Sequence, residues 1–173
     1  IYHGGSFARK IDELVEPERK IKFNLKNFIF TAGSISPARG LEDIIIAMGL
    51  LKAEGVNLPD LLIAGQCIDS MASYKKSLVK LINKFNIQKN IIWCGYLSEQ
   101  ELGWCYMNSA ITVITSRVES FCMIAHEAMS YGANIISSDN KCLPEILGEG
   151  AIYYQSYNSQ QLCKLIKENR SNN

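Results

Sequence analysis

The sequence TSRVESFCMIAHEAMSYG, residues Thr115 to Gly132, follows a short apolar run that ends at Ile114. An apolar run that passes through small polar residues into a helical pattern is typical of a strand–loop–helix unit. We expect this helix to begin near Phe121 and to stop at Gly132. Its first turn then presents free backbone N–H groups and the positive end of the helix dipole, and both favour a bound phosphate group.

Two carboxylates, Glu119 and Glu127, bracket the start of this helix. Glu119 lies in the loop, whereas Glu127 follows Met123 by one helical turn and Ser120 by two, so that it shares their face. This arrangement suits a ligand with a diphosphate in the middle and hydroxyl groups at both ends. Taken alone, Glu119 is also compatible with a solvated loop carboxylate, and Glu127 with a helix residue that caps a local group.

The composition around this stretch is that of an ordinary globular domain. The chain has 173 residues, of which 47% are hydrophobic and 20% are charged, and its net charge is +1. This length is sufficient for one domain with a sizeable core. The charge balance gives no preference for nucleic acid or lipid, and no apolar run reaches the roughly 18 residues of a spanning helix. Because the chain begins with Ile1, we expect it to be a piece of a longer protein.

The cysteine and histidine content argues against disulfides and zinc. The six cysteines form no CxxC pair, and we expect them to be buried, reduced thiols of a cytosolic protein. Only two histidines are present, so a mixed His/Cys zinc site is not expected. His126 points away from Glu127 on the helix, and we assign it to packing.

Apolar runs alternate with helical patterns along most of the chain, which indicates a parallel sheet covered by helices on both faces. Residues 1–27 are of mixed charge and weakly periodic, so we treat them as a segment that precedes the domain. The capping box Ser98-Glu99-Gln100-Glu101 marks the start of one helix. The expected strands are residues 28–33, 60–65, 90–95, 111–114, 134–138 and 151–154.

Ligands of such sheets bind at the carboxyl ends of the strands, where this sequence has glycines and a serine. These residues are Gly33, Gly65, Gly95 and Ser116. Glycine lets the chain turn sharply and lets a ligand approach the backbone closely.

Arg39 falls in the first turn of a helix that we expect to start at Ser36-Pro37, where an acidic residue is favoured. We therefore regard it as a candidate for neutralising a ligand phosphate, together with Arg117 and the helix start near Phe121. The alternative is that a neighbouring acid, Glu42 or Asp43, neutralises Arg39.

Several common signatures are absent from the sequence. It has no GxGxxG dinucleotide fingerprint, no GxxxxGK[ST] phosphate loop and no GxSxG nucleophile elbow. It also has no DxD pair, the usual means by which a nucleotide-sugar enzyme holds a metal ion.

Five motifs occur in order between residues 28 and 154, and together they resemble the C-terminal donor domain of one enzyme family. The motifs are Gly33-Ser34-x4-Arg39-Gly40, Ile63-Ala64-Gly65, Trp93-Cys94-Gly95, Ser116-x2-Glu119-Ser120-Phe121-Cys122-x4-Glu127-Ala128-Met129-x2-Gly132 and Pro144-Glu145-Ile146. The family is that of the retaining GT-B glycosyltransferases of the family four type, which contains sucrose synthase and many bacterial polysaccharide mannosyl-, glucosyl- and galactosyltransferases. The resemblance implies a Rossmann-like, doubly wound parallel sheet of six strands in residues 28–173. It also implies a hinge in residues 1–27 and an N-terminal acceptor domain outside this chain.

The resemblance also implies a role for each matching residue. Glu119 would bind hydroxyl groups of the donor sugar, Glu127 those of the ribose, and Arg39 the leaving diphosphate. Tyr96 and Leu97 would lie near the base. Glu119 and Arg39 are thus the implied catalytic residues. The implied donor-binding residues are Gly33, Ser34, Arg39, Gly65, Gln66, Tyr96, Leu97, Ser120, Phe121, Cys122, Met123 and Glu127.

The sequence departs from the family pattern at four positions. Ser34 stands where an arginine is usual, Arg39 where a lysine is usual, and Ser120 and Cys122 where two glycines are usual. The arginine still pairs with phosphate, but side chains at 120 and 122 are expected to narrow the diphosphate cradle.

The implied function is transfer of a hexose or N-acetylhexosamine from a nucleoside-diphosphate sugar, with UDP favoured, to a polysaccharide or lipid-linked glycan. We expect no metal or other cofactor, a cytoplasmic location with membrane contact through the missing domain, and a role in surface polysaccharide synthesis such as O-antigen or lipopolysaccharide. This chain alone is expected to be inactive. The alternatives are a nucleotide-sugar epimerase domain and a non-catalytic α/β interaction domain.

Overall fold

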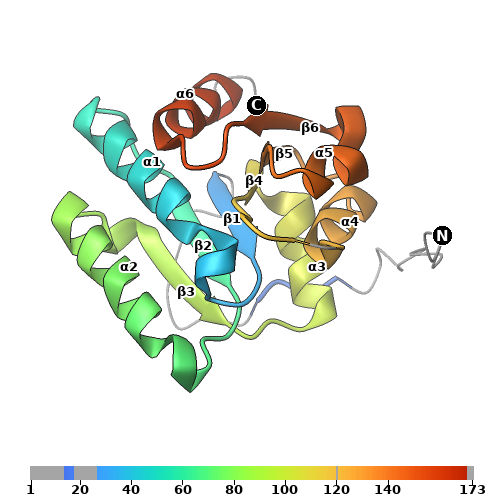
Figure 1. Cartoon of the computed structure of the whole chain (residues 1–173), viewed down its shortest axis with the longest axis horizontal. Helices are drawn as coiled ribbons and strands as arrows, with labels where there is room; N and C mark the ends of the chain where they lie inside the picture. Colours follow the sequence, from blue (N-terminus) through green and yellow to red (C-terminus); the bar gives the residue numbers. More distant parts are fainter. Residues whose placement is uncertain (1–13, 18–26, 120, 171–173) are drawn as a thin grey trace.

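The computed structural model describes residues 14–17, 27–119 and 121–170, and within them the chain forms one parallel sheet between two layers of helices (Figure 1). The sheet has six strands in the order β3-β2-β1-β4-β5-β6, and every neighbouring pair is parallel. The strands are β1 (Phe28–Ala32), β2 (Asp60–Ala64), β3 (Ile91–Gly95), β4 (Ile111–Ile114), β5 (Ile135–Ser138) and β6 (Ala151–Tyr154). The predicted Rossmann-like, doubly wound fold is therefore confirmed. Most of the predicted hinge, as well as Ser120, lies outside the described residues.

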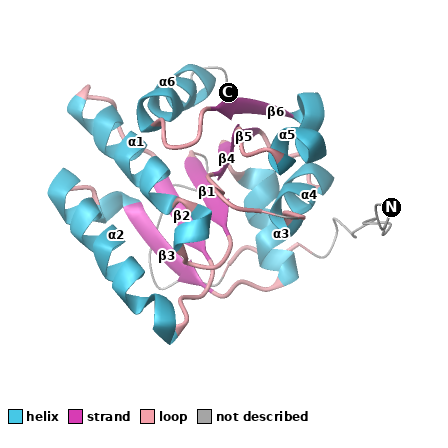
Figure 2. Ribbon diagram, viewed as in Figure 1, coloured by secondary structure: helices cyan, strands magenta, loops and turns pink. Residues whose placement is uncertain are grey.

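Within the described residues, six α-helices cover the two faces of the sheet (Figure 2). They are α1 (Leu41–Ala53), α2 (Ala72–Phe85), α3 (Glu99–Asn108), α4 (Met123–Ser130), α5 (Cys142–Leu147) and α6 (Ser159–Arg170). Helices α1, α2 and α6 pack on one face, and α3, α4 and α5 pack on the other. The order of the strands reverses between β1 and β4, so the loops that follow these two strands leave toward opposite faces.

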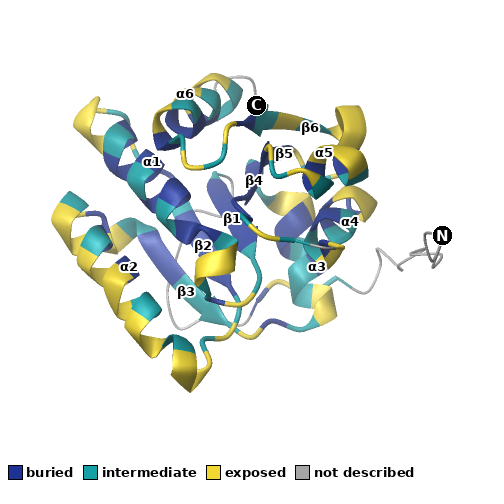
Figure 3. Ribbon diagram, in the orientation of Figure 1, coloured by how far each residue is buried: buried dark blue, intermediate teal, exposed yellow. Residues whose placement is uncertain are grey.

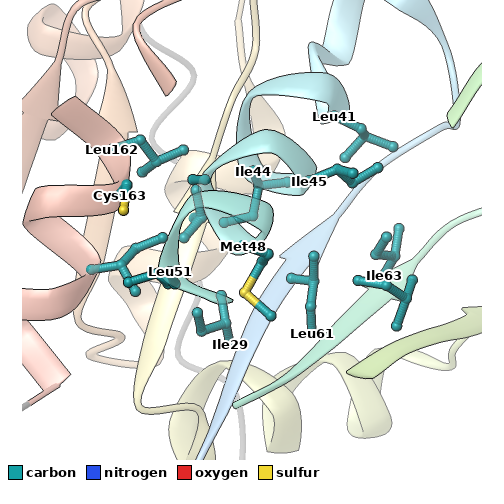
Figure 4. Close-up of a cluster of buried hydrophobic side chains, with 14 of the residues drawn as sticks. Ile29, Leu41, Ile44, Ile45, Met48, Leu51, Leu61, Ile63, Leu162 and Cys163 are labelled. Carbon is teal, nitrogen blue, oxygen red and sulfur yellow. The ribbon is translucent and has the colours of Figure 1, made fainter. Parts of the chain in front are cut away.

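The alternation of side chains along β1 divides the core in two. Ile29 joins the cluster beneath α1, α2 and α6, whereas Phe28 and Phe30 point to the opposite cluster. Figure 4 shows Ile29 among the side chains of α1, with Leu162 and Cys163 of α6 beside them. The inner strands β1, β2, β4 and β5 are dark blue along most of their length in Figure 3, which is the burial expected for a parallel sheet covered on both sides. The edge strands β3 and β6 are less buried.

The second cluster is rich in aromatic rings. Phe28 stacks with Trp104 at 6.0 Å between ring centroids, and Phe30 meets Tyr106 edge-on at 5.1 Å. Tyr106 also stacks with Tyr131 of the segment after α4, at 6.1 Å. The rings of Trp104 and Tyr106 are therefore packing elements of α3.

The predicted helix start was correct at Ser98, two residues early near Phe121, and wrong at Ser36-Pro37. At Ser98 the capping box is present, since its hydroxyl accepts from the Glu101 amide and the Glu101 side chain accepts from the Ser98 amide. Residues Pro37–Arg39 instead form a separate 3-10 turn, and α1 starts only after Gly40, which has a φ of +60°. Helix α4 starts at Met123, because Cys122 interrupts the helical path with a φ of +25°.

The last helix, α6, continues to Arg170, whose guanidinium donates to the carbonyl of Asn57. All six cysteines are free thiols, as expected, but half of them are only partly buried. The buried ones are Cys105, Cys122 and Cys163.

Candidate functional site

A cleft of about 370 Å³ lies at the carboxyl ends of β1, β2 and β3 and extends to α4. The residues predicted from the sequence that line it are Gly33, Ser34, Gly65, Gln66, Tyr96, Leu97 and Glu127. The sequence analysis missed its other lining residues, which are Ala32, Ala64, Ile68, Leu102 and Ile124. Most of these are apolar residues of strand ends and helices, which resemble ordinary core positions in the sequence.

The floor of this cleft requires glycine. Gly65 has a φ of +142°, and a Cβ atom there would lie 1.8 Å from the carbonyl oxygen of Gly33. Gly33 has a φ of +125°, and its Cβ would lie 2.8 Å from the Ile124 side chain and 2.9 Å from that of Arg39. The backbones after β1 and β2 thus approach each other more closely than any side chain permits, so a ligand in the cleft meets bare backbone.

The two residues predicted to be catalytic contact each other beside the cleft. The guanidinium of Arg39 forms an ion pair with Glu119, and it also donates to the hydroxyl of Ser116 at 3.1 Å. Ser116 in turn donates to Glu119 at 3.0 Å. The alternative in which Glu42 or Asp43 neutralises Arg39 is therefore wrong.

Hydrogen bonds hold the β1–α1 and β4–α4 loops together around this ion pair. Thr115 donates through its hydroxyl to the carbonyl of Arg39 at 2.5 Å, and the Arg117 amide donates to the Ala38 carbonyl at 2.8 Å. Ser138 of β5 donates to the Ser116 carbonyl at 2.7 Å. The sequence had placed Ser116 at a strand end, but the role of its side chain in joining Arg39 to Glu119 became visible only in the fold.

Arg117, the other predicted phosphate candidate, has a structural partner instead. Its guanidinium donates to Asp43 at 3.1 Å, lies 3.5 Å from Glu42 and packs over the Tyr157 ring at 4.2 Å. Asp43 is only 2% exposed and also accepts from the Tyr154 hydroxyl and the Tyr157 amide, each at 3.1 Å. Arg117 and Asp43 thus tie α1, the β4–α4 loop and the β6–α6 loop together, and Arg117 is not directed to a ligand.

We expect Asp43→Asn to lower the free energy of unfolding by about 2 kcal/mol, because Arg117 then loses a charged hydrogen-bond partner in a buried site. Burial and the Asp43 charge raise the pKa of Tyr154, so its hydroxyl stays protonated. It can therefore still donate a hydrogen bond to the side-chain oxygen of an asparagine at position 43. Denaturant unfolding measures this change. Asp139→Asn, at an exposed carboxylate that accepts from the Ser156 amide, is the control with an expected loss below about 1 kcal/mol. Equal losses in the two variants would contradict the assignment.

The start of α4 differs from the predicted diphosphate cradle. The Ala125 amide already donates to the Cys122 carbonyl at 2.9 Å, so the helix end presents the amides of Met123 and Ile124 rather than that of Phe121. Cys122 is only 3% exposed, and it packs in the core beneath α3, α4 and α5. The Cys122 side chain therefore does not narrow the diphosphate cradle as expected. A cysteine in place of the usual glycine instead affects the backbone, because a positive φ is unfavourable for residues other than glycine.

Glu127 projects from α4 into the cleft, and a buried residue of α3 hydrogen-bonds to its carboxylate. The hydroxyl of Tyr106 donates to Oε2 of Glu127 at 3.3 Å. His126, the next residue, has its ring 5.0 Å from that of Phe121, in accord with the packing role expected for it. The site thus has a carboxylate in the cleft, a helix N-terminus next to it, and the Arg39–Glu119 pair beyond Gly33.

The described part of the chain offers neither a membrane span nor a metal cluster. None of its helices has both the length and the apolar composition needed to cross a bilayer. No three of its His, Cys, Asp and Glu side chains are grouped so that they could hold a metal ion.

Solved structures with the same fold include several glycosyltransferases. The C-terminal domain of a group 1 family glycosyl transferase (LpcC) from Francisella tularensis has a TM-score of 0.72 at 23% identity, with 84% of this chain and 76% of that chain covered. Anabaena HepE in complex with UDP has a TM-score of 0.72 at 19% identity, covering 83% of this chain and 39% of that one. Sucrose-phosphate synthase from Thermosynechococcus elongatus reaches 0.77 at 17% identity, covering 95% and 42%.

Sequence comparisons lead to the same family. The serotype-specific mannosyltransferase WbdA of Escherichia coli is 24% identical over 151 residues, which are 86% of this chain and 18% of that protein. An uncharacterised 41.2 kDa protein of the Klebsiella pneumoniae cps region is 30% identical over 63 residues, or 36% of this chain and 18% of that protein. The chain thus spans less than a fifth of these relatives. The model of the family "Glycosyl transferases group 1" matches residues 10–173, and the chain therefore belongs to this family of GT-B glycosyltransferases.

Proposed function

We propose that this chain is the donor-binding domain of a retaining glycosyltransferase that uses a nucleoside-diphosphate sugar. The observation that carries the proposal is the cleft, in which the backbone of Gly33 and Gly65 faces the carboxylate of Glu127. UDP is the favoured nucleotide, since a neighbour of the same fold was solved with UDP. The cleft volume of about 370 Å³ falls in the usual range for small-molecule sites.

In the proposed arrangement the nucleotide lies with its ribose at Glu127 and its base near Tyr96 and Leu97. The diphosphate lies between the start of α4 and Arg39, and the sugar lies at Glu119. Cleavage of the sugar–phosphate bond develops negative charge on the leaving diphosphate. The Arg39 guanidinium and the amides of the α4 N-terminus stabilise that charge from fixed positions, which is the main contribution that such a site makes to catalysis.

The finer features of the reaction belong to the proposal as well. We propose a hexose or N-acetylhexosamine donor, transfer to a polysaccharide or lipid-linked glycan, and metal-independent chemistry. The acceptor then binds an N-terminal domain of the same protein, at the cytoplasmic face of the membrane. The mannosyltransferase relative WbdA, described as serotype-specific, supports a role in surface polysaccharide synthesis.

Titration calorimetry of the purified chain with UDP and with GDP tests the proposal. We expect binding of at least one of them, and we expect Glu127→Ala to weaken it by about 10- to 100-fold, because charged hydrogen bonds to the ribose hydroxyls are lost. Glu149→Ala removes an exposed carboxylate outside the cleft and serves as the matched control. If neither nucleotide binds at millimolar concentration, or if Glu127→Ala binds like the control, the donor-site assignment is wrong.

A further inference from the structure

Tyr106 is a buried residue of α3 whose hydroxyl group reaches the carboxylate in the cleft. Its side chain is 0% exposed, and its hydroxyl lies 3.3 Å from Oε2 of Glu127. Phe30 of β1 packs against the ring edge-on, with an interplanar angle of 81°, and Tyr131 stacks on it at 14°. Packing from β1 and from the segment after α4 therefore fixes where the hydroxyl points.

In this hydrogen bond Tyr106 is the donor and Glu127 is the acceptor. Burial, together with the negative charge of Glu127, raises the pKa of Tyr106 well above its usual value. The phenol therefore keeps its proton and acts as the donor, while the carboxylate accepts. Each carboxylate oxygen has two lone pairs, so Oε2 can accept from Tyr106 and still accept from a ligand hydroxyl.

A glutamate in a cleft otherwise loses rotational freedom when it binds a ligand, and that loss opposes binding. A donor that already holds the carboxylate reduces this cost before the ligand arrives. From this geometry we infer that Tyr106 is a positioning residue, which orients Glu127 for the two adjacent hydroxyl groups of a nucleotide ribose. The inference rests on the proposed function, since it assigns a supporting residue to the same cleft.

The substitution Tyr106→Phe removes the hydroxyl and leaves the ring in its packing. We expect the Kd for UDP to rise by about 10-fold, in line with the loss of a hydrogen bond to a charged group. The Kd for 2′,3′-dideoxy-UDP, which has no ribose diol, should change less than about twofold because Glu127 has nothing to bind there. The preference for UDP over its dideoxy analogue thus falls, and calorimetry with both nucleotides measures it. If the chain binds GDP instead, GDP and 2′,3′-dideoxy-GDP replace this pair.

Tyr154→Phe is a matched control, because Tyr154 is also 0% exposed and also donates to a carboxylate, that of Asp43. It should leave the ribose preference unchanged even if it lowers the melting temperature. A second measurement uses the Glu127→Ala background, in which adding Tyr106→Phe should not change the Kd for UDP further.

An unchanged ribose preference in Tyr106→Phe would overturn the inference. So would an equal loss of affinity for UDP and its dideoxy analogue, because a purely structural role predicts that result. Failure of the proposed function is distinct, since the unmodified chain would then bind neither nucleotide. If the unmodified chain binds UDP and dideoxy-UDP equally well, the assignment of Glu127 to the ribose hydroxyl groups is wrong, and so is the positioning role of Tyr106.

Discussion

The substitution Arg39→Ala is expected to lower kcat of the complete glycosyltransferase by about 10²- to 10³-fold, the usual loss when one fixed donor to a developing oxyanion is removed. Of the two arginines considered for the leaving diphosphate, Arg39 is the one assigned to it in the proposed site, because Arg117 is engaged by Asp43 and Glu42. The effect on KM is expected to be smaller, since the charge on the leaving group grows as the bond breaks. Steady-state kinetics with the donor sugar nucleotide measure both constants.

The contact between Arg39 and Glu119 makes this prediction specific. In the ligand-free chain the two side chains neutralise each other, so a bound diphosphate has to share Arg39 with Glu119 or replace it. Arg39→Lys keeps the positive charge and restores the residue usual in the family, and it should retain kcat within about 10-fold. If Arg39→Lys is as impaired as Arg39→Ala, geometry rather than charge decides the role of Arg39. Unchanged kcat in Arg39→Ala would contradict the role altogether.

The substitution Gly65→Ala is expected to lower the free energy of unfolding by about 3 kcal/mol or more and to abolish nucleotide binding. The new methyl group would overlap the Gly33 carbonyl, since 1.8 Å separates their positions, and the φ of +142° is unfavourable for alanine. The carbonyl belongs to backbone that hydrogen bonds tie to β2, so relief requires the strand ends to move apart. Denaturant unfolding and UDP titration measure the two effects.

Gly55→Ala is the matched control for this experiment. Gly55 also has a positive φ, +73°, but a Cβ atom there meets nothing within 4 Å. Gly55→Ala should lower the free energy of unfolding by only about 1 kcal/mol, the cost of a left-handed backbone conformation for alanine, and leave the cleft intact. Similar losses of stability in the two variants would show that the cost of Gly65→Ala comes from the φ angle rather than from the contact with Gly33.

Local sequence signals predicted the elements of this fold well. The six apolar runs became the six strands with ends shifted by at most one residue, because a strand buried on both faces must be apolar throughout. The capping box at Ser98 formed as expected, since its two hydrogen bonds join residues that are close in the sequence. Strand-end glycines also located the edge of the sheet at which the cleft lies.

Signals that depend on distant partners were misjudged. Pro37 predicted the start of α1, but Gly40 adopts a left-handed conformation where a Cβ would lie 2.5 Å from the Thr115 carbonyl. Arg117 was a candidate phosphate ligand until the fold placed Asp43, which lies 74 positions away in the sequence, beside it. Local propensity cannot foresee such contacts, because they exist only after the sheet has formed.

Apolar periodicity and motifs in a fixed order were enough to predict the strands, the parallel sheet between two helical layers, the sheet edge that carries the cleft, and the family. Which charged side chains meet could be seen only in the folded chain. The fold paired Arg39 with Glu119 and placed the Ser116 hydroxyl where it bonds to both. It also assigned Arg117 to Asp43 and set the Tyr106 hydroxyl against Glu127. The physical reason is that ion pairs and buried hydrogen bonds depend on distances of a few ångström between segments far apart in the chain.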